Sequence, residues 1–243
     1  MVNNPGADMT SLAERSRQSE QMDADDLDPA TYAKVMVGLA RINRWTFTAH
    51  SVLPFLKRTA GNAPSFSLLD VGFGQGDMLR IIERWARRRG IAAKLVGVDL
   101  NPRSAPIARD ATDGDTRIDF RTGDYADQTD SFDFIISSQV AHHMTDAQLQ
   151  HFIRHMEGAA RRGWVIGDLH RRRLAYEFYP LLARALRVHR IVREDGQLSI
   201  ARSFRRAEWA DIMDRAGLTL DQYRITRRFP YRLSVERNKR TPA

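Results

Sequence analysis

The sequence contains no cysteine. This absence excludes disulfide bonds, zinc sites built from thiolates and cysteine nucleophiles. No stretch approaches the ~20 consecutive apolar residues of a membrane-spanning helix. The first 26 residues also lack the basic and apolar blocks of a secretory signal. We therefore expect a cytoplasmic protein without a membrane span.

Acidic residues are scarce in the second part of the chain. Residues 1–150 carry 17 Lys and Arg against 20 Asp and Glu, whereas residues 151–243 carry 21 against 10. Such a basic region can indicate a nucleic-acid or anionic-membrane partner. Nearly all of the basic residues are arginine, which favours a compositional bias and solvated helix faces instead. We therefore do not expect a nucleic-acid partner.

Alternating apolar segments predict an α/β fold. At 243 residues the chain is long enough for one such domain with additions. Short apolar, β-branched runs at residues 66–71, 94–100, 117–124, 131–138 and 163–169 alternate with helical patterns. This rhythm predicts a Rossmann-like, mostly parallel sheet with helices on both faces. Two later runs, 220–229 and 231–237, predict a hairpin joined at Pro230.

The flanking segments predict a division of the chain. Residues 1–26 are polar, and we expect them to be disordered or frayed. Asp28 and Pro29 are start signals for a helix, a second helix is predicted over 46–58, and residues 27–60 are interpreted as a helical cap. The main domain then covers 61–243, with an insertion at 170–204 that holds a helix interrupted near Pro180, followed by a turn within 193–204.

Glycines are concentrated in one loop, where Gly72, Gly74 and Gly76 follow the first predicted strand. A dinucleotide fingerprint G-x-G-x-x-G would need glycine at position 77, where Asp77 stands, and no G-K-[ST] of a phosphate loop follows. Asp70 and Asp77 would also be unfavourable neighbours of a pyrophosphate. A dehydrogenase and a phosphate-loop nucleotide site are therefore disfavoured.

Three acidic residues follow three successive strands and favour a cofactor with a positive end. Asp70 can hold an amino group, Asp99 can accept both ribose hydroxyls, and Asp124 can accept from an adenine amino group, with Leu100 and Tyr125 flanking the base. S-adenosylmethionine carries an ammonium, a sulfonium and a carboxylate, so it fits this set. Asp99 alone would also suit a nicotinamide cofactor.

The segments "LLDVGFGQGD", "GVDLN", "TGDYAD" and "FDFIISSQVAHHM" resemble the motifs of class I S-adenosylmethionine-dependent methyltransferases, over Ser65 to Leu169. The resemblance implies a seven-stranded sheet with an antiparallel last strand. It implies cofactor contacts at Asp70, Gly72, Gly74, Gly76, Asp99, Leu100, Asp124, Tyr125 and Ser138. Arg44, on the cap, is a further candidate for the cofactor carboxylate, although a surface arginine is the simpler interpretation.

A finer resemblance lies outside these motifs. "ARINRW", "AHHMTDAQLQHFIRHMEGAARRGWVIGDLHRRRLAY" and "DGQLSIARSFRRAEW" are similar to small bacterial methyltransferases of the ubiquinone-biosynthesis-like branch, including polyketide-associated enzymes. This resemblance implies a small, hydroxylated aromatic or polyketide-like acceptor. We expect methylation on oxygen, and methylation on carbon stays open as the alternative.

Histidines supply the candidate catalytic groups. His142 and His143 follow the fourth strand on the ligand side, where an imidazole can take a proton from a hydroxyl acceptor. We favour His143, while the alternative is one packed and one exposed histidine. His151 and His155 have a metal-pair spacing, but no H-E-x-x-H motif exists, so no metal is expected.

Other polar and aromatic residues are weaker candidates for contact with the substrate. They are Asp168, His170, Tyr176, Tyr179 and Arg202, each of which has an equally simple structural explanation. Two other functions stay open: an RNA methyltransferase that uses the basic region, and a non-catalytic methyltransferase-like binding protein.

Overall fold

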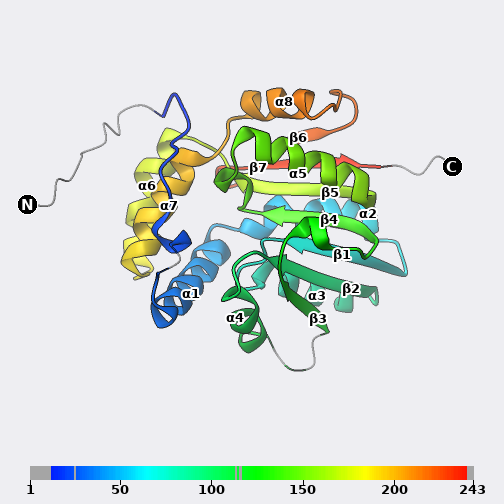
Figure 1. The fold of residues 1–243 in the computed structure, drawn as a ribbon, viewed down its shortest axis with the longest axis horizontal. Helices are drawn as coiled ribbons and strands as arrows, with labels where there is room; N and C mark the ends of the chain where they lie inside the picture. Colours follow the sequence, from blue (N-terminus) through cyan, green and yellow to red (C-terminus); the bar gives the residue numbers. More distant parts are fainter. Residues whose placement is uncertain (1–11, 25, 113, 115–116, 240–243) are drawn as a thin grey trace, which may run out of the picture.

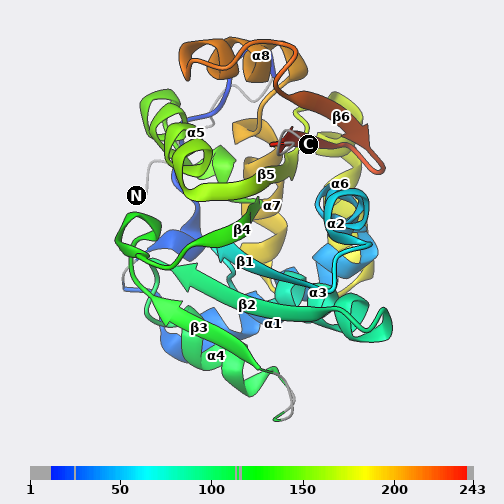
Figure 2. The same ribbon diagram turned by 90° about the vertical axis from the view of Figure 1, so that its right-hand side faces the viewer.

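The computed structural model describes residues 12–24, 26–112, 114 and 117–239, and its centre is a seven-stranded sheet (Figures 1 and 2). The strand order is β3-β2-β1-β4-β5-β7-β6. Strand β7 is antiparallel to both of its neighbours, and the remaining pairs are parallel. The strands are β1 Ser65–Val71, β2 Ala92–Asp99, β3 Ile118–Thr122, β4 Phe132–Ser138, β5 Ala160–Leu169, β6 Arg224–Arg228 and β7 Arg232–Asn238. The expected mostly parallel Rossmann-like sheet and the terminal hairpin are confirmed.

Helices cover both faces of the sheet because its central strands are apolar on both sides. Leu68 and Leu69 of β1 are both buried, and they belong to two different hydrophobic clusters. One cluster includes α2 Leu53–Ala60, α3 Asp77–Arg88 and α4 Ser104–Asp110. The other includes α5 Asp146–Ala159 and α8 Arg206–Arg215. No helix in the described part of the chain is long and apolar enough to cross a membrane.

A third cluster joins segments that are far apart in the sequence. Three helices lie together beyond one end of the strands, at the left of Figure 1. They are α1 Pro29–Trp45, α6 Arg173–Ala185 and α7 Arg190–Arg202. Val35 of α1 is buried in the same cluster as Ala183 of α6 and Val192 of α7. Helix α1 begins as predicted, with the Asp28 side chain accepting from the Thr31 N–H. The predicted cap segment 27–60 therefore splits, since α1 joins α6 and α7 while α2 covers the sheet.

The amino-terminal segment 12–24 is ordered against α7, which differs from the frayed structure expected for residues 1–26. The Ser16 N–H donates to the Ala201 carbonyl. The carboxylate of Asp195 accepts from the backbone N–H groups of Gln21 and Met22, where the short helix η1 Gln21–Asp23 begins. Buried acceptors on α7 thus replace water as partners of this polar segment. Residues 1–11 and 25 lie outside the described residues.

Two further local expectations were wrong. The helix expected over 46–58 is instead the turn η2 Thr48–Ser51 followed by α2, because Phe47 is left-handed and Pro54 lies in the first turn of α2. The turn expected within 193–204 is part of α7. Within this segment, a Cβ at Gly196 would lie only 2.0 Å from the Tyr179 hydroxyl. This glycine therefore serves the close contact between α6 and α7.

The loop after β1 contains glycines for two separate reasons. Gly72, Gly74 and Gly76 all have positive φ angles, of 74°, 56° and 75°. A Cβ at Gly72 would also meet Val140, and a Cβ at Gly76 would lie 2.7 Å from the Phe120 ring. The tight turn thus brings the backbone against the loop after β4 and seats α3 on β3.

Alanine substitutions at Gly76 and Gly90 separate backbone strain from packing. Both glycines have positive φ, but a Cβ at Gly90 would meet nothing within 4 Å. We expect Gly90→Ala to lower the free energy of unfolding by about 1 kcal/mol. Gly76→Ala should lower it by a further ~1–3 kcal/mol through overpacking against Phe120. Urea unfolding measures both, and equal losses would contradict the packing argument.

Candidate functional site

A cavity of about 600 Å³ lies at the carboxyl ends of β1, β2 and β4. Its walls come from the loops that follow these strands, from α1 and from residues 20–23. In open parallel sheets, ligands bind in this crevice. The volume is typical of small-molecule sites, which span ~300–1,000 Å³.

Asp70 is the most unfavourably placed group in the cavity. It is 1% exposed, and neither carboxyl oxygen has a hydrogen-bond partner among the described residues. Burial, with smaller contributions from Asp77 and Asp99, raises its pKa well above the ordinary value. The hydroxyl oxygen of Ser138 is also buried and has no hydrogen-bond partner among the described residues. Buried polar groups without partners are costly, so both atoms point to a polar ligand, and Asp70 points to a cationic one.

Asp99 and Asp77 extend this acidic wall. Asp99 Oδ2 accepts from the Gly74 N–H at 2.9 Å, and Oδ1 accepts from the Asn101 N–H at 2.9 Å. Each of these oxygens keeps capacity for another donor. Asp77, in the first turn of α3, accepts from Asn43 Nδ2 at 3.4 Å. Burial raises the pKa of both carboxyl groups.

Two histidines from the turn η4 Ala141–His143 line the same cavity. His142 Nδ1 lies 2.7 Å from Asp168 Oδ1, and the His142 N–H donates to Asp168 Oδ2 at 2.8 Å. Burial alone would raise the pKa of Asp168, but His142, the Leu169 N–H and His143 together outweigh burial, so the pKa is lowered. His143 Nδ1 lies 3.0 Å from Asp23 Oδ2. A carboxylate therefore holds each ring at its Nδ1 atom.

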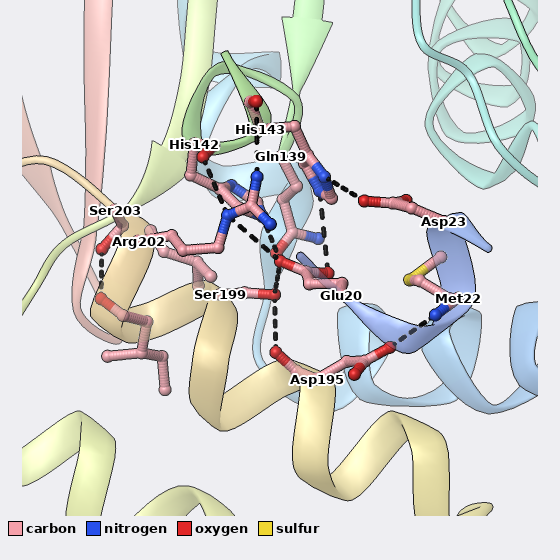
Figure 3. A network of polar contacts seen from close by, with 12 residues as sticks. Glu20, Met22, Asp23, Gln139, His142, His143, Asp195, Ser199, Arg202 and Ser203 are labelled. Carbon is pink, nitrogen blue, oxygen red and sulfur yellow. Dashed lines mark hydrogen bonds and ion pairs between the residues drawn. The ribbon is translucent and has the colours of Figure 1, made fainter. Parts of the chain in front are cut away.

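Glu20 faces both imidazoles from the amino-terminal segment (Figure 3). Its carboxyl oxygens lie 3.6 Å from His142 Nε2 and 3.8 Å from His143 Nε2. Oε1 accepts from the Ser199 hydroxyl at 2.9 Å. The residue is 3% exposed, and burial raises its pKa to about 7.

The structure gathers most of the expected cofactor residues. Those that line the cavity are Asp70, Gly72, Gly74, Asp99, Leu100, Tyr125 and Ser138. The two catalytic candidates, His142 and His143, line it as well. Three expected residues are not among the lining residues. Gly76 packs on Phe120, Asp124 caps the turn η3 Tyr125–Asp127 by accepting from the Ala126 N–H, and Arg44 is exposed on α1.

None of the five expected substrate residues lines this cavity. Asp168 and Arg202 instead hydrogen-bond the turn that carries the two histidines. Asp168 accepts from His142, and Arg202 donates to the carbonyl oxygens of His142 and His143. Asp168 does not pair with His170, because the Asp168 carboxylate is engaged by His142. His170 is buried beside Phe204, and burial together with nearby arginines lowers its pKa to about 4.

The two tyrosines belong to the contact between α6 and α7. The Tyr179 hydroxyl donates to the Val192 carbonyl at 2.7 Å, and burial raises its pKa beyond the ordinary value. The Tyr176 carbonyl accepts from Gln197 Nε2 at 3.1 Å. Both residues are half-buried in this helix pair, so the structural explanation fits them better than contact with a ligand in the cavity.

Sequence reasoning missed several lining residues. Asn43 is the neighbour of the expected Arg44 and lines the cavity in its place, whereas Gln139 lines the cavity beside the expected Ser138. Gln139 Nε2 donates to Asn43 Oδ1, and the buried Arg232 donates to Gln139 Oε1 at 3.0 Å. Glu20 and Asp23 carry no local signal, because only the folded chain brings them to the histidines.

A sequence model of the family described as "Methyltransferase domain" matches residues 43–223. Among curated proteins, none matches the sequence significantly.

Solved structures of methyltransferases share the fold. Magnesium protoporphyrin IX methyltransferase from Synechocystis, with bound S-adenosylhomocysteine, is 17% identical, with 90% of this chain and 91% of that chain covered and a TM-score of 0.55. Human N-acetylserotonin methyltransferase in complex with S-adenosylmethionine is 14% identical, with 88% and 57% covered and a TM-score of 0.61. An O-methyltransferase family 2 protein from Planctomyces limnophilus, in complex with apigenin, is 16% identical, with 89% and 63% covered and a TM-score of 0.60.

Replacement of Asp70 by asparagine should stabilise the ligand-free protein. Because the folded-state pKa of Asp70 is raised, its contribution to stability is greatest below the unfolded-state pKa and declines as the pH rises above about 4. Asp70→Asn removes this decline, so its gain in the free energy of unfolding should grow between pH 4 and pH 7. Urea unfolding across this range measures the gain.

Asp130→Asn is the control for this comparison. Asp130 is a surface residue whose pKa is lowered by hydrogen bonds from Arg121 and Lys94, so its replacement should bring no gain at any pH. A stability difference for Asp70→Asn that does not change with pH would contradict the buried, protonated carboxyl.

Proposed function

This chain belongs to the methyltransferase-domain family and is a class I S-adenosylmethionine-dependent methyltransferase, and from this premise we propose that it methylates an oxygen of a small, hydroxylated acceptor, aromatic or polyketide-like. The observation that carries the proposal is one cavity with two chemically different walls. Unpaired and partly paired carboxyl groups form one wall, and two carboxylate-held imidazoles line the other.

The acidic wall suits the cofactor. When bound, S-adenosylmethionine supplies a methyl group activated by a positively charged sulfonium. Asp70 would hold the ammonium group, which gives its buried carboxyl oxygens the partner that they lack. Asp99 would accept from the ribose hydroxyls with its remaining lone pairs, and Leu100 and Tyr125 would flank the base. We assign these roles on the chemistry of the groups that line the cavity.

The cover over the cavity supports a small acceptor. Glu20, Met22 and Asp23 from the amino-terminal segment line the cavity, as do Met36 and Leu39 of α1. A ligand beneath this cover is partly enclosed by protein, which suits a compact molecule better than a polymer. The methionine and leucine side chains provide apolar surface, as an aromatic ring or polyketide chain requires.

The imidazole pair is the place where we expect the acceptor hydroxyl to lose its proton. Methyl transfer from a sulfonium is an in-line displacement, so the protein has to align the acceptor and raise the electron density on its oxygen. Asp168 and Asp23 engage the Nδ1 atoms and thereby leave the Nε2 atoms of His142 and His143 with free lone pairs. Arg202 fixes the backbone of this turn and so keeps both rings in place.

Methylation assays with labelled S-adenosylmethionine test the function directly. We expect transfer to members of a panel of phenols, catechols, hydroquinones and hydroxylated polyketides, and no transfer to the matching methyl ethers, which have no free hydroxyl. The site of methylation is read by mass spectrometry. Transfer only to amines, to carbon atoms or to RNA would contradict the proposal.

His143→Asn should lower turnover about 10²–10⁴-fold, because the hydroxyl loses a group that promotes its deprotonation. The affinity for S-adenosylmethionine, measured by calorimetry, should stay within a few-fold of the wild-type value. His151→Asn, an exposed histidine on α5, is the matched control and should leave both quantities unchanged. Unaltered turnover in His143→Asn would make His143 a structural residue.

A further inference from the structure

Three potential metal ligands lie close together at the wall of the cavity that the two imidazoles line. Glu20, His142 and His143 each offer one possible ligand atom, and these three atoms lie within 4.8 Å of one another (Figure 3). The geometry points to a site for a divalent transition-metal ion, with Glu20, His142 and His143 as ligands. A set of two imidazoles and one carboxylate is a known donor set for Zn²⁺ and Fe²⁺, and it leaves positions open for water or substrate.

The outer partners of the two imidazoles are those that metal-binding histidines have. Asp168 Oδ1 lies 2.7 Å from His142 Nδ1, and Asp23 Oδ2 lies 3.0 Å from His143 Nδ1. A carboxylate at Nδ1 places the proton there and leaves the lone pair on Nε2. The Nε2 atoms are also the ones that face the Glu20 carboxylate. Both rings are therefore in the tautomer and orientation that ligation by Nε2 requires.

The distances between the ligand atoms fit a bridging ion better than direct hydrogen bonds. Glu20 Oε1 is 3.6 Å from His142 Nε2, and Oε2 is 3.8 Å from His143 Nε2, both too long for a hydrogen bond. Ligands about 2.0–2.2 Å from a tetrahedral ion lie roughly 3.3 Å apart. The two carboxylate–imidazole distances exceed this separation by only a few tenths of an ångström, and all three ligand atoms lie within 4.8 Å of one another.

The charge of the cluster is complementary to a divalent cation. The charged groups at the cluster include three carboxylates, those of Glu20, Asp23 and Asp168, and the guanidinium of Arg202. The imidazoles are counted as neutral, as metal ligation requires. Ionised, these four groups sum to two negative charges. Arg202 directs its donors to backbone carbonyl oxygens, so Glu20 keeps lone pairs for the ion.

The position of the cluster gives the ion access and a role. His142 and His143 line both the 600 Å³ cavity and a second cavity of about 820 Å³ on the side of residues 13–17. The role rests on the proposed function, but it makes the Nε2 atoms of both histidines ligands of the ion and not proton acceptors. The acceptor oxygen would bind the ion through an open position, its O–H bond would break, and the proton would pass to solvent. A metal ion lowers the pKa of a bound hydroxyl, so methylation would take place on the oxygen anion.

Calorimetric titration of chelator-treated full-length protein with Zn²⁺ tests the site without any assay of activity. We expect one equivalent to bind, and Co²⁺ to give visible absorption bands that Zn²⁺ removes. Glu20→Gln preserves the size of the side chain and should weaken binding at least ~100-fold. Asp23→Asn, which changes only an outer partner on a partly exposed residue, should weaken it ~10–100-fold. His151→Asn is the control and should bind as the wild type does.

The outcomes separate the metal site from the proposed function. Absence of binding by Zn²⁺, Co²⁺, Mn²⁺ and Fe²⁺ in folded protein overturns the site, and so does binding that Glu20→Gln leaves unchanged. Circular dichroism identifies a variant that fails to fold, and Asp23→Asn then decides the question. Methylation that is lost with the chelator and restored by one equivalent of metal supports the role, whereas full methylation by chelated protein overturns it. If metal binds as expected but no hydroxylated acceptor is methylated, the proposed function fails and the site stands.

Discussion

The hydrogen-bonded pair of Asp168 and His142 is the interaction on which the site depends. Asp168 lies near the end of β5 and is fully enclosed, and its two oxygens accept from the ring and from the backbone N–H of His142. One carboxylate thus fixes both the path of the turn after β4 and the direction of the imidazole. His143 follows in the same turn, so its ring is positioned by the same anchor. Asp23 and Arg202 then complete the placement of the His143 ring.

Buried arginines connect this anchor to the cover of the site, which gives the basic half of the chain a structural role. Arg202 of α7 donates to the carbonyl oxygens of His142, His143 and Gln18, and so joins the turn to the amino-terminal segment. Arg171 donates to the carbonyl oxygens of Leu12 and Ser203, and Arg232 donates to that of Thr46. The planar guanidinium can bind several acceptors at fixed angles, which lysine cannot do. Part of the arginine excess therefore reflects packing rather than a polyanionic partner.

The sequence was informative wherever function follows from strand ends. Asp70 and Asp99 were predictable because parallel strands end at one edge of a sheet. Asp124 was not, because β3 already ends at Thr122 and the aspartate caps the next turn instead. The turn expected within 193–204 was wrong, since Gly196 in this segment allows a helix contact with Tyr179 that no local pattern records. Glu20 had no signal at all, since its partners are distant in the chain and its own segment is polar.

The cavity also shows why stability and ligand binding oppose each other in this fold. Asp70, Asp77, Asp99 and Glu20 all have pKa values raised by burial, so the ligand-free protein holds acidic groups in an environment that favours their neutral form. The nearby arginines do not neutralise them, because their donors are committed largely to backbone carbonyls. An acidic cavity without compensating positive charge therefore favours either protonated carboxyl groups or a ligand that carries positive charge.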